Sequence, residues 1–173
     1  MSLHLVDTSV WINFFRAGET PAVRRLKTLL QTDADVCITA QILQEILQGT
    51  RDEAQFEKYL KYFSSQPMLH PRNPVGCAIA AARIYFDCRR RGLTVRSAND
   101  CIIAQVALEH DAVLLHDDAD FAQIAKDAGA STSARRTTPR ASDSSSWRTG
   151  HAMSPCPTSS MPPSANTPES GAY

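Results

Sequence analysis

The segment VLLHDDAD at residues 113–120 joins a short apolar run to a cluster of acidic residues. Residues 112–115 predict a buried strand, and residues 118–128 predict a helix that Gly129 ends. Upstream, residues 3–6 predict a second buried strand, which ends at Asp7. Residues 36–39 and 68–70 predict further short strands, and helical segments separate all four. This alternation favours an α/β fold with a short, mostly parallel sheet.

Apolar residues recur at helical spacing between these strands. The first helix is expected to start near Val10, with Thr8 or Ser9 as its N-cap. Gly49 is the expected C-terminal cap of a helix at residues 42–49. The remaining helices are expected at residues 22–30, 52–63, 75–91 and 99–110.

Composition divides the chain of 173 residues near position 130. Residues 131–173 contain 23 Ser, Thr or Pro among 43 positions and no Leu, Ile, Val or Phe, so they offer too little apolar surface to offset their ordering entropy. We therefore expect a folded unit at residues 1–130, with net charge −2, and a disordered tail at residues 131–173, with net charge +2. This balance excludes nucleic-acid binding driven by bulk charge and leaves a local basic surface open.

Apolar runs and cysteine spacing bear on the setting of the protein. No run approaches the roughly 18–20 apolar residues of a membrane-spanning helix. Residues 1–7 lack the basic region and the apolar stretch of a signal peptide. The five cysteines include no Cys-x-x-Cys pair, which argues against a thiolate zinc site and favours a reduced, cytoplasmic setting.

Acidic residues follow two of the expected strands. Asp7 follows the first strand, and three acids follow the strand at 112–115, namely Asp117, Asp118 and Asp120. If the two strands are parallel neighbours, these carboxylates share the edge of the sheet where ligands gather in such folds. Asp100 near the start of one helix and Glu45 within another complete the set. Each acid alone fits a cap, a turn or a solvated face, whereas three acids in four positions also fit a hard divalent cation.

Four segments carry these acids in order: residues 5–12 (LVDTSVWI), 38–39 with 43–49 (IT and LQEILQG), 98–107 (ANDCIIAQVA) and 113–125 (VLLHDDADFAQIA). Together they resemble the PIN-domain ribonucleases, specifically the VapC-type toxins of bacterial and archaeal toxin–antitoxin pairs. The resemblance covers about 125 residues. It implies a three-layer α/β/α fold around the short parallel sheet.

The resemblance also implies roles for individual residues. Four acids would bind the metal and carry catalysis: Asp7, Glu45, Asp100 and Asp118. An additional acid and three polar residues would support them: Asp120, Thr8, Ser9 and Asn99. His116 stands where the family often has Thr or Ser, and we expect it to make a supporting hydrogen bond, with titration as the alternative. Asp117 occupies a variable position and is expected to be a solvated charge.

The activity implied by the resemblance is cleavage of RNA by water that one or two Mg²⁺ or Mn²⁺ ions activate. Four arginines are candidates for guiding the RNA backbone into the acidic pocket: Arg89, Arg90, Arg91 and Arg96. An Arg run at a helix end equally serves to satisfy the last carbonyls of that helix. The implied partners are a VapB-type antitoxin that covers the site and a second copy of the chain in a homodimer.

Other functions remain open at this point. A phosphatase with Asp7 as its nucleophile wants a second acid two residues later, where this chain has Ser9. A receiver-like binding module leaves Glu45 and Asn99 without a role. An inactive or truncated PIN protein that only binds antitoxin or RNA is a third alternative.

Residues 130–136 lack the apolar side chains of the family's last strand, so that strand is expected to be missing. The tail that follows resembles either a frameshift product or a native extension.

Overall fold

The sheet at the centre of the molecule has four parallel strands and one short antiparallel strand at its edge. The computed structural model describes residues 2–32, 34–132 and 146–147. The strands are β1 (His4–Val6), β2 (Val36–Thr39), β3 (Met68–Leu69), β4 (Val113–Leu115) and β5 (Ser146–Trp147), in the order β3-β2-β1-β4-β5. All four strands expected from the sequence are therefore confirmed.

Strand β1 is the centre of the sheet and pairs in parallel with β2 on one side and with β4 on the other. Leu5 lies opposite Cys37 of β2 and Leu114 of β4. Strands β1, β2 and β4 are buried along their whole length, which explains their continuous apolar composition. The ends of β1 and β4 that precede Asp7 and His116 consequently lie side by side.

The helices lie close to the positions that the sequence predicts. They are α1 (Thr8–Phe15), α2 (Pro21–Gln31), α3 (Ala40–Gln48), α4 (Glu53–Phe63), α5 (Pro74–Arg90), α6 (Ala98–Glu109) and α7 (Ala119–Thr132). The expected cap of the first helix was wrong, because the N-cap is Asp7, whose side chain accepts a hydrogen bond from the backbone N–H of Ser9. The expected stop at Gly129 was also wrong, since α7 continues through it to Thr132. A glycine costs only about 1 kcal/mol within a helix, which is too little to end one alone.

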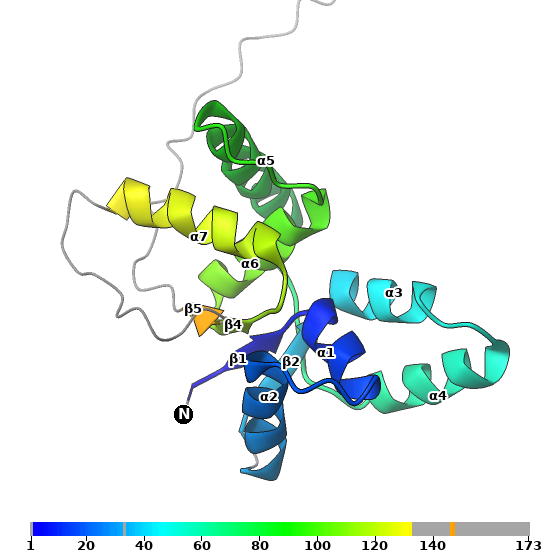
Figure 1. Ribbon diagram of the computed structural model, residues 1–173. Helices are drawn as coiled ribbons and strands as arrows, with labels where there is room; N and C mark the ends of the chain where they lie inside the picture. Colours follow the sequence, from blue (N-terminus) through cyan, green and yellow to red (C-terminus); the bar gives the residue numbers. More distant parts are fainter. Residues whose placement is uncertain (1, 33, 133–145, 148–173) are drawn as a thin grey trace, which may run out of the picture.

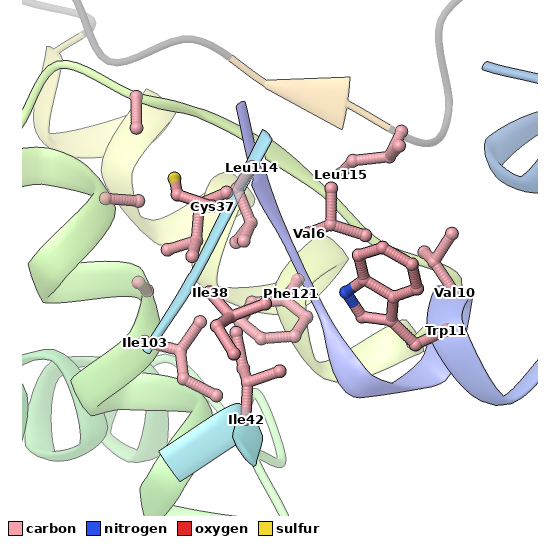
Figure 2. Packing of buried hydrophobic residues seen from close by; sticks show 14 of the residues in the cluster. Val6, Val10, Trp11, Cys37, Ile38, Ile42, Ile103, Leu114, Leu115 and Phe121 are labelled. Carbon is pink, nitrogen blue, oxygen red and sulfur yellow. The ribbon is translucent and has the colours of Figure 1, made fainter. Parts of the chain in front are cut away.

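Two groups of helices enclose the sheet, as expected for a three-layer fold (Figure 1). Helices α5, α6 and α7 contact one another on one side, and α1 and α2 pack together on the other. Side chains that alternate along the strands reach both layers. Figure 2 shows Leu115 with Val6 and Trp11 on one side of the strands, and Leu114 with Cys37 on the other. Each of these five side chains is no more than 1% exposed.

Strand β5 pairs antiparallel with β4, placing Trp147 opposite Leu114 and Ser146 opposite Leu115. It supplies two residues at the sheet edge where the family's apolar last strand was expected to be missing. Residues 131 and 132 of the expected tail belong to α7, while residues 133–145 and 148–173 lie outside the described residues. Among the helices that the structure describes, none is long and apolar enough to cross a membrane.

Candidate active site

The acidic residues gather where β1 and β4 end. The backbone N–H of Asp7 donates to the carbonyl oxygen of Leu115 at 2.9 Å, which extends the pairing of the two strands by one step. From β1 the chain continues to β2 and β3 on one side of the sheet and then returns to β4 on the other side. The strand order therefore reverses between β1 and β4. This position is the usual ligand site of an open parallel sheet, and the expectation that the two sets of acids share one edge is confirmed.

Asp7 is held by Ser9. One carboxylate oxygen, Oδ2, accepts from the backbone N–H of Ser9 at 2.8 Å and from its hydroxyl at 2.6 Å. Burial raises the pKa of Asp7 to about 6, even though the hydrogen bonds from Ser9 oppose the shift. Asp7 therefore caps α1 and presents a carboxylate in a poorly solvated position.

Glu45 is oriented by two polar side chains from different helices. The hydroxyl of Thr8 donates to Oε2 of Glu45 at 2.7 Å, and the amide nitrogen of Asn99 donates to Oε1 at 2.9 Å. Thr8 opens α1 and Asn99 lies in the first turn of α6, so Glu45 links α3 to both. The structure thus places Thr8 and Asn99 where they orient an acid.

Asp100 lies in the first turn of α6 and is 8% exposed. Burial raises the pKa of its carboxyl to about 7, with further contributions from repulsion by Asp7, Asp118, Asp120 and Glu45. These acids therefore add negative charge to the surroundings of Asp100. The group is therefore short of positive charge.

Arg96 supplies part of that charge. Its Nη2 donates to Oδ1 of Asp118 at 2.9 Å, and its Nε donates to Oδ1 of Asp120 at 3.0 Å. Burial raises the pKa of Asp120, but hydrogen bonds from the backbone and side chain of Arg96 outweigh this effect and hold the pKa below its usual value. The structure pairs Arg96 with two of the predicted site acids, and its role in guiding RNA stays a prediction.

Asp117 is not the solvated charge that its variable position predicts. Its Oδ2 accepts from the amide of Asn13 at 3.0 Å and from the hydroxyl of Thr20 at 2.6 Å. Its backbone N–H donates to the hydroxyl of Ser9 at 3.0 Å. Asp117 therefore ties the end of β4 to α1 and to Thr20, the N-cap of α2.

His116 supports the turn after β4 through its own backbone neighbour. Its Nδ1 lies 3.0 Å from the carbonyl oxygen of Asp118, and its ring packs against Phe121 with centroids 5.1 Å apart. Burial lowers the pKa of His116, so the neutral imidazole is favoured. The supporting hydrogen bond expected for this residue is the contact that the structure shows.

Three of the predicted guiding arginines lie at the end of α5. The guanidinium of Arg89 lies 5.9 Å from the ring centroid of Tyr85, and that of Arg90 lies 5.8 Å from that of Phe86. The backbone N–H of Arg91 caps the helix by donating to carbonyls of the last turn. These contacts hold the basic helix end together, and a role in guiding RNA stays a prediction.

The donor atoms of the site favour a hard cation. Within residues 2–32, 34–132 and 146–147, no three acidic, histidine or cysteine side chains stand close enough together to form a complete metal site. The acids are instead engaged with Ser9, Thr8, Asn99 and Arg96. Their all-oxygen chemistry and the repulsion around Asp100 nevertheless fit a divalent cation that binds oxygen ligands.

Sequence comparison supplies the family. A family model described as PIN domain matches residues 4–127. The chain belongs to the PIN-domain family. This PIN domain is also 39% identical over 123 residues to Ribonuclease VapC11 of Mycobacterium tuberculosis strain H37Rv, which corresponds to 70% of this chain and 91% of that protein. VapC ribonuclease Mb1587 of Mycobacterium bovis matches it with the same identity and coverage. The resemblance drawn from four segments of the sequence is therefore confirmed.

Solved structures show the same fold as this PIN domain. VapBC-1 from nontypeable Haemophilus influenzae matches with a TM-score of 0.57 and 19% identity, covering 72% of this chain and 93% of that one. VapBC2 from Rickettsia felis, bound to a promoter DNA fragment, matches with a TM-score of 0.54 and 17% identity, covering 70% and 92%. The expected PIN-like α/β fold is thus confirmed by structure as well as by sequence.

Sequence reasoning missed two residues that organise the acids of the PIN domain, and it missed the partners of a third. Asn13 and Thr20 bind Asp117 from 104 and 97 positions away, and no local pattern marks either of them. Arg96 was named as a candidate for guiding RNA, but its pairing with the acids was not expected. Its partners, Asp118 and Asp120, lie 22 and 24 positions downstream, and no residue near Arg96 in the sequence indicates them.

Proposed function

We propose that this PIN domain is a metal-dependent endoribonuclease that acts as the toxin of a VapBC-type pair. Four acids, Asp7, Glu45, Asp100 and Asp118, are the residues that would hold the cation and carry catalysis, with Mg²⁺ as the first choice and Mn²⁺ as the alternative. The observation that carries the proposal is the position of Asp7 and Asp118 directly after the neighbouring parallel strands β1 and β4, together with Asp100 of α6. Burial, and after it repulsion by Asp7, Asp118, Asp120 and Glu45, raises the pKa of Asp100 to about 7.

The residues of the chain prepare this edge for phosphodiester hydrolysis. When bound, a divalent cation would lower the pKa of water and neutralise charge on the scissile phosphate. Ser9 orients Asp7, while Thr8 and Asn99 orient Glu45, so two of the acids are held before any ligand arrives. Oδ1 of Asp118 accepts from Arg96 and from the backbone N–H of Asp120. Such outer contacts commonly fix the orientation of metal ligands.

RNA, a VapB-type antitoxin and a second copy of the chain are the proposed partners. The relatives named VapC ribonuclease support RNA as the substrate, and the solved VapBC structures support the antitoxin. We propose a cytoplasmic location, in keeping with Cys37, Cys77 and Cys101, which are buried and form no disulfide. We further propose that the functional unit ends close to residue 130, since the family model matches residues 4–127.

An aspartyl phosphatase fits the geometry less well. Such a phosphatase needs a second acid two residues after its nucleophile. This chain has Ser9 there, whose hydroxyl donates to the Asp7 carboxylate.

The test is cleavage of a single-stranded RNA mixture by the full chain with Mg²⁺, with Mn²⁺ and with EDTA. We expect cleavage by wild type with either cation, none with EDTA, and a loss of at least about a hundredfold in Asp7→Asn. Asp87→Asn is the matched control, because Asp87 forms an exposed ion pair with Arg83 on α5. Equal cleavage by wild type and Asp7→Asn, or full cleavage in EDTA, would refute the proposal.

A further inference from the structure

Arg96 is the basic residue that bridges two acids of the site. It lies in the connection between α5 and α6, directly before Ser97, the N-cap of α6. Its side chain is 67% exposed, yet two of its nitrogens donate to carboxylates from the segment after β4. Its backbone N–H also donates to Asp120, so Arg96 is held by three hydrogen bonds to two acids rather than by one exposed ion pair.

Asp120 is fully engaged in holding Arg96. Its side chain is 4% exposed, its Oδ2 accepts from the backbone N–H of Arg96 at 2.6 Å, and its Oδ1 accepts from Nε of Arg96 at 3.0 Å. Both carboxylate oxygens therefore point to the same residue. Asp120 therefore holds Arg96 in place, and neither of its carboxylate oxygens is left without a hydrogen bond to bind a cation.

Asp118 is the acid that Arg96 shares with any cation. Its Oδ1 accepts from Nη2 of Arg96 at 2.9 Å and from the backbone N–H of Asp120 at 2.9 Å. Its side chain is 36% exposed, so it is far more accessible than that of Asp120. A cation that approaches Asp118 therefore meets a guanidinium already placed on the carboxylate.

The positive charge of Arg96 on Asp118 affects how strongly the acids can bind a cation. Asp100 is repelled by Asp7, Glu45, Asp118 and Asp120, and Arg96 forms ion pairs with the last two of these acids. A unit positive charge at ion-pair range opposes the binding of a dication to the same carboxylate. It also lowers the cost of assembling the acids when no dication is present.

We propose that Arg96 is an internal counter-cation, which occupies Asp118 in the cation-free protein and gives up this contact when a divalent cation binds. Asp120 keeps hold of the backbone and Nε of Arg96, so the guanidinium loses one partner without leaving the site. Arg96 is thus a positioning residue that sets how tightly the acids bind metal. The inference rests on the proposed function, because it takes the four acids to be the metal-binding group.

The test compares Mn²⁺ and Mg²⁺ binding by calorimetry in the full chain and in Arg96→Gln, Arg96→Lys and Arg83→Gln. Arg96→Gln removes the charge, so we expect Mn²⁺ to bind about tenfold more tightly than to wild type. Arg96→Lys keeps the charge and should return the affinity close to that of wild type. Arg83→Gln is the matched control, because Arg83 pairs with Asp87 on α5 and should leave the affinity unchanged. A purely structural role of Arg96 would weaken binding in Arg96→Gln.

A measurement on wild type covers the case in which Arg96→Gln does not fold. In nitrogen-15 spectra, saturating Mg²⁺ should free the Nη groups of Arg96 to rotate while the Nε–H signal stays protected by Asp120. Slow Nη rotation that persists at saturation would overturn the inference, as would equal or weaker Mn²⁺ binding by folded Arg96→Gln. Absence of Mn²⁺ and Mg²⁺ binding in every variant would overturn the proposed function and the inference with it. Binding that is unaffected by Arg96→Gln would overturn the inference alone.

Discussion

Replacing Asp117 with alanine tests whether this carboxylate joins three elements of the fold. Its Oδ2 accepts hydrogen bonds from Asn13 of α1 at 3.0 Å and from Thr20 of the α2 cap at 2.6 Å. A hydrogen bond to a charged group contributes about 1.5–3 kcal/mol, and partial exposure places these two toward the lower end. We therefore expect Asp117→Ala to lower the free energy of unfolding by about 2–4 kcal/mol, well above a typical surface substitution.

Urea denaturation of the full chain, followed by circular dichroism, measures this loss. Asp87→Ala is the matched control, since it removes one exposed i,i+4 pair and should cost less than about 0.5 kcal/mol. A double-mutant cycle with Asn13→Ala should show a coupling of about 1 kcal/mol, because the two side chains share a hydrogen bond. The reasoning is refuted if Asp117→Ala is no more destabilising than Asp87→Ala, or if the cycle shows no coupling.

Three further predictions address the core, the cysteines and the acids. Phe63 is fully buried, with its ring centroid 5.0 Å from that of Trp11. Phe63→Ala should therefore lower the free energy of unfolding, measured by urea denaturation, by about 3–5 kcal/mol. Phe86 is 50% exposed, so Phe86→Ala should lower it by under about 1 kcal/mol. Burial raises the pKa of Cys37 and Cys101 to about 12, so the native Cys156→Ser variant should react with a thiol reagent at pH 8 only as fast as it unfolds, and a rapid phase would contradict this. The raised pKa of Asp100, about 7, means that the folded state binds a proton that the unfolded state has released, so stability should fall as pH rises from about 4 to 7. In EDTA, Asp100→Asn should therefore raise the melting temperature at pH 7.5, with a smaller gain at pH 5, and a lower melting temperature at pH 7.5 would contradict the assignment.

Local patterns in the sequence predict the strands and helices well because the information they need is local. Strand β4 follows from one apolar run, and its acids follow from the residues directly after it. Asp7 shows the limit of this reasoning, since Thr8 and Ser9 were equally good capping residues by type. The choice of Asp7 depends on where β1 ends, and that end is set by its pairing with Leu115.

Partners of the acids were harder to predict because they come from distant parts of the chain. Asp117 looks unremarkable in its own segment, and its role exists only once α1 and the start of α2 are folded against the end of β4. Arg96 likewise appears in the sequence as an isolated arginine, five residues after the run at 89–91, and only the fold places Asp120 beside it. Composition gives the number of charges, whereas the fold decides which of them are paired.

Ser9 connects the register of the sheet to the orientation of Asp7. The N–H of Asp7 donates to the carbonyl oxygen of Leu115, the last residue of β4. Two residues further on, the N–H of Asp117 donates to the hydroxyl of Ser9. With that oxygen already accepting, the hydroxyl proton of Ser9 is directed to Oδ2 of Asp7. The end of β1 and the end of β4 are therefore closed into one ring of hydrogen bonds. Replacing the hydroxyl alone leaves the N–H of Ser9 to cap α1, while the Asp7 carboxylate loses a donor and the N–H of Asp117 loses its acceptor.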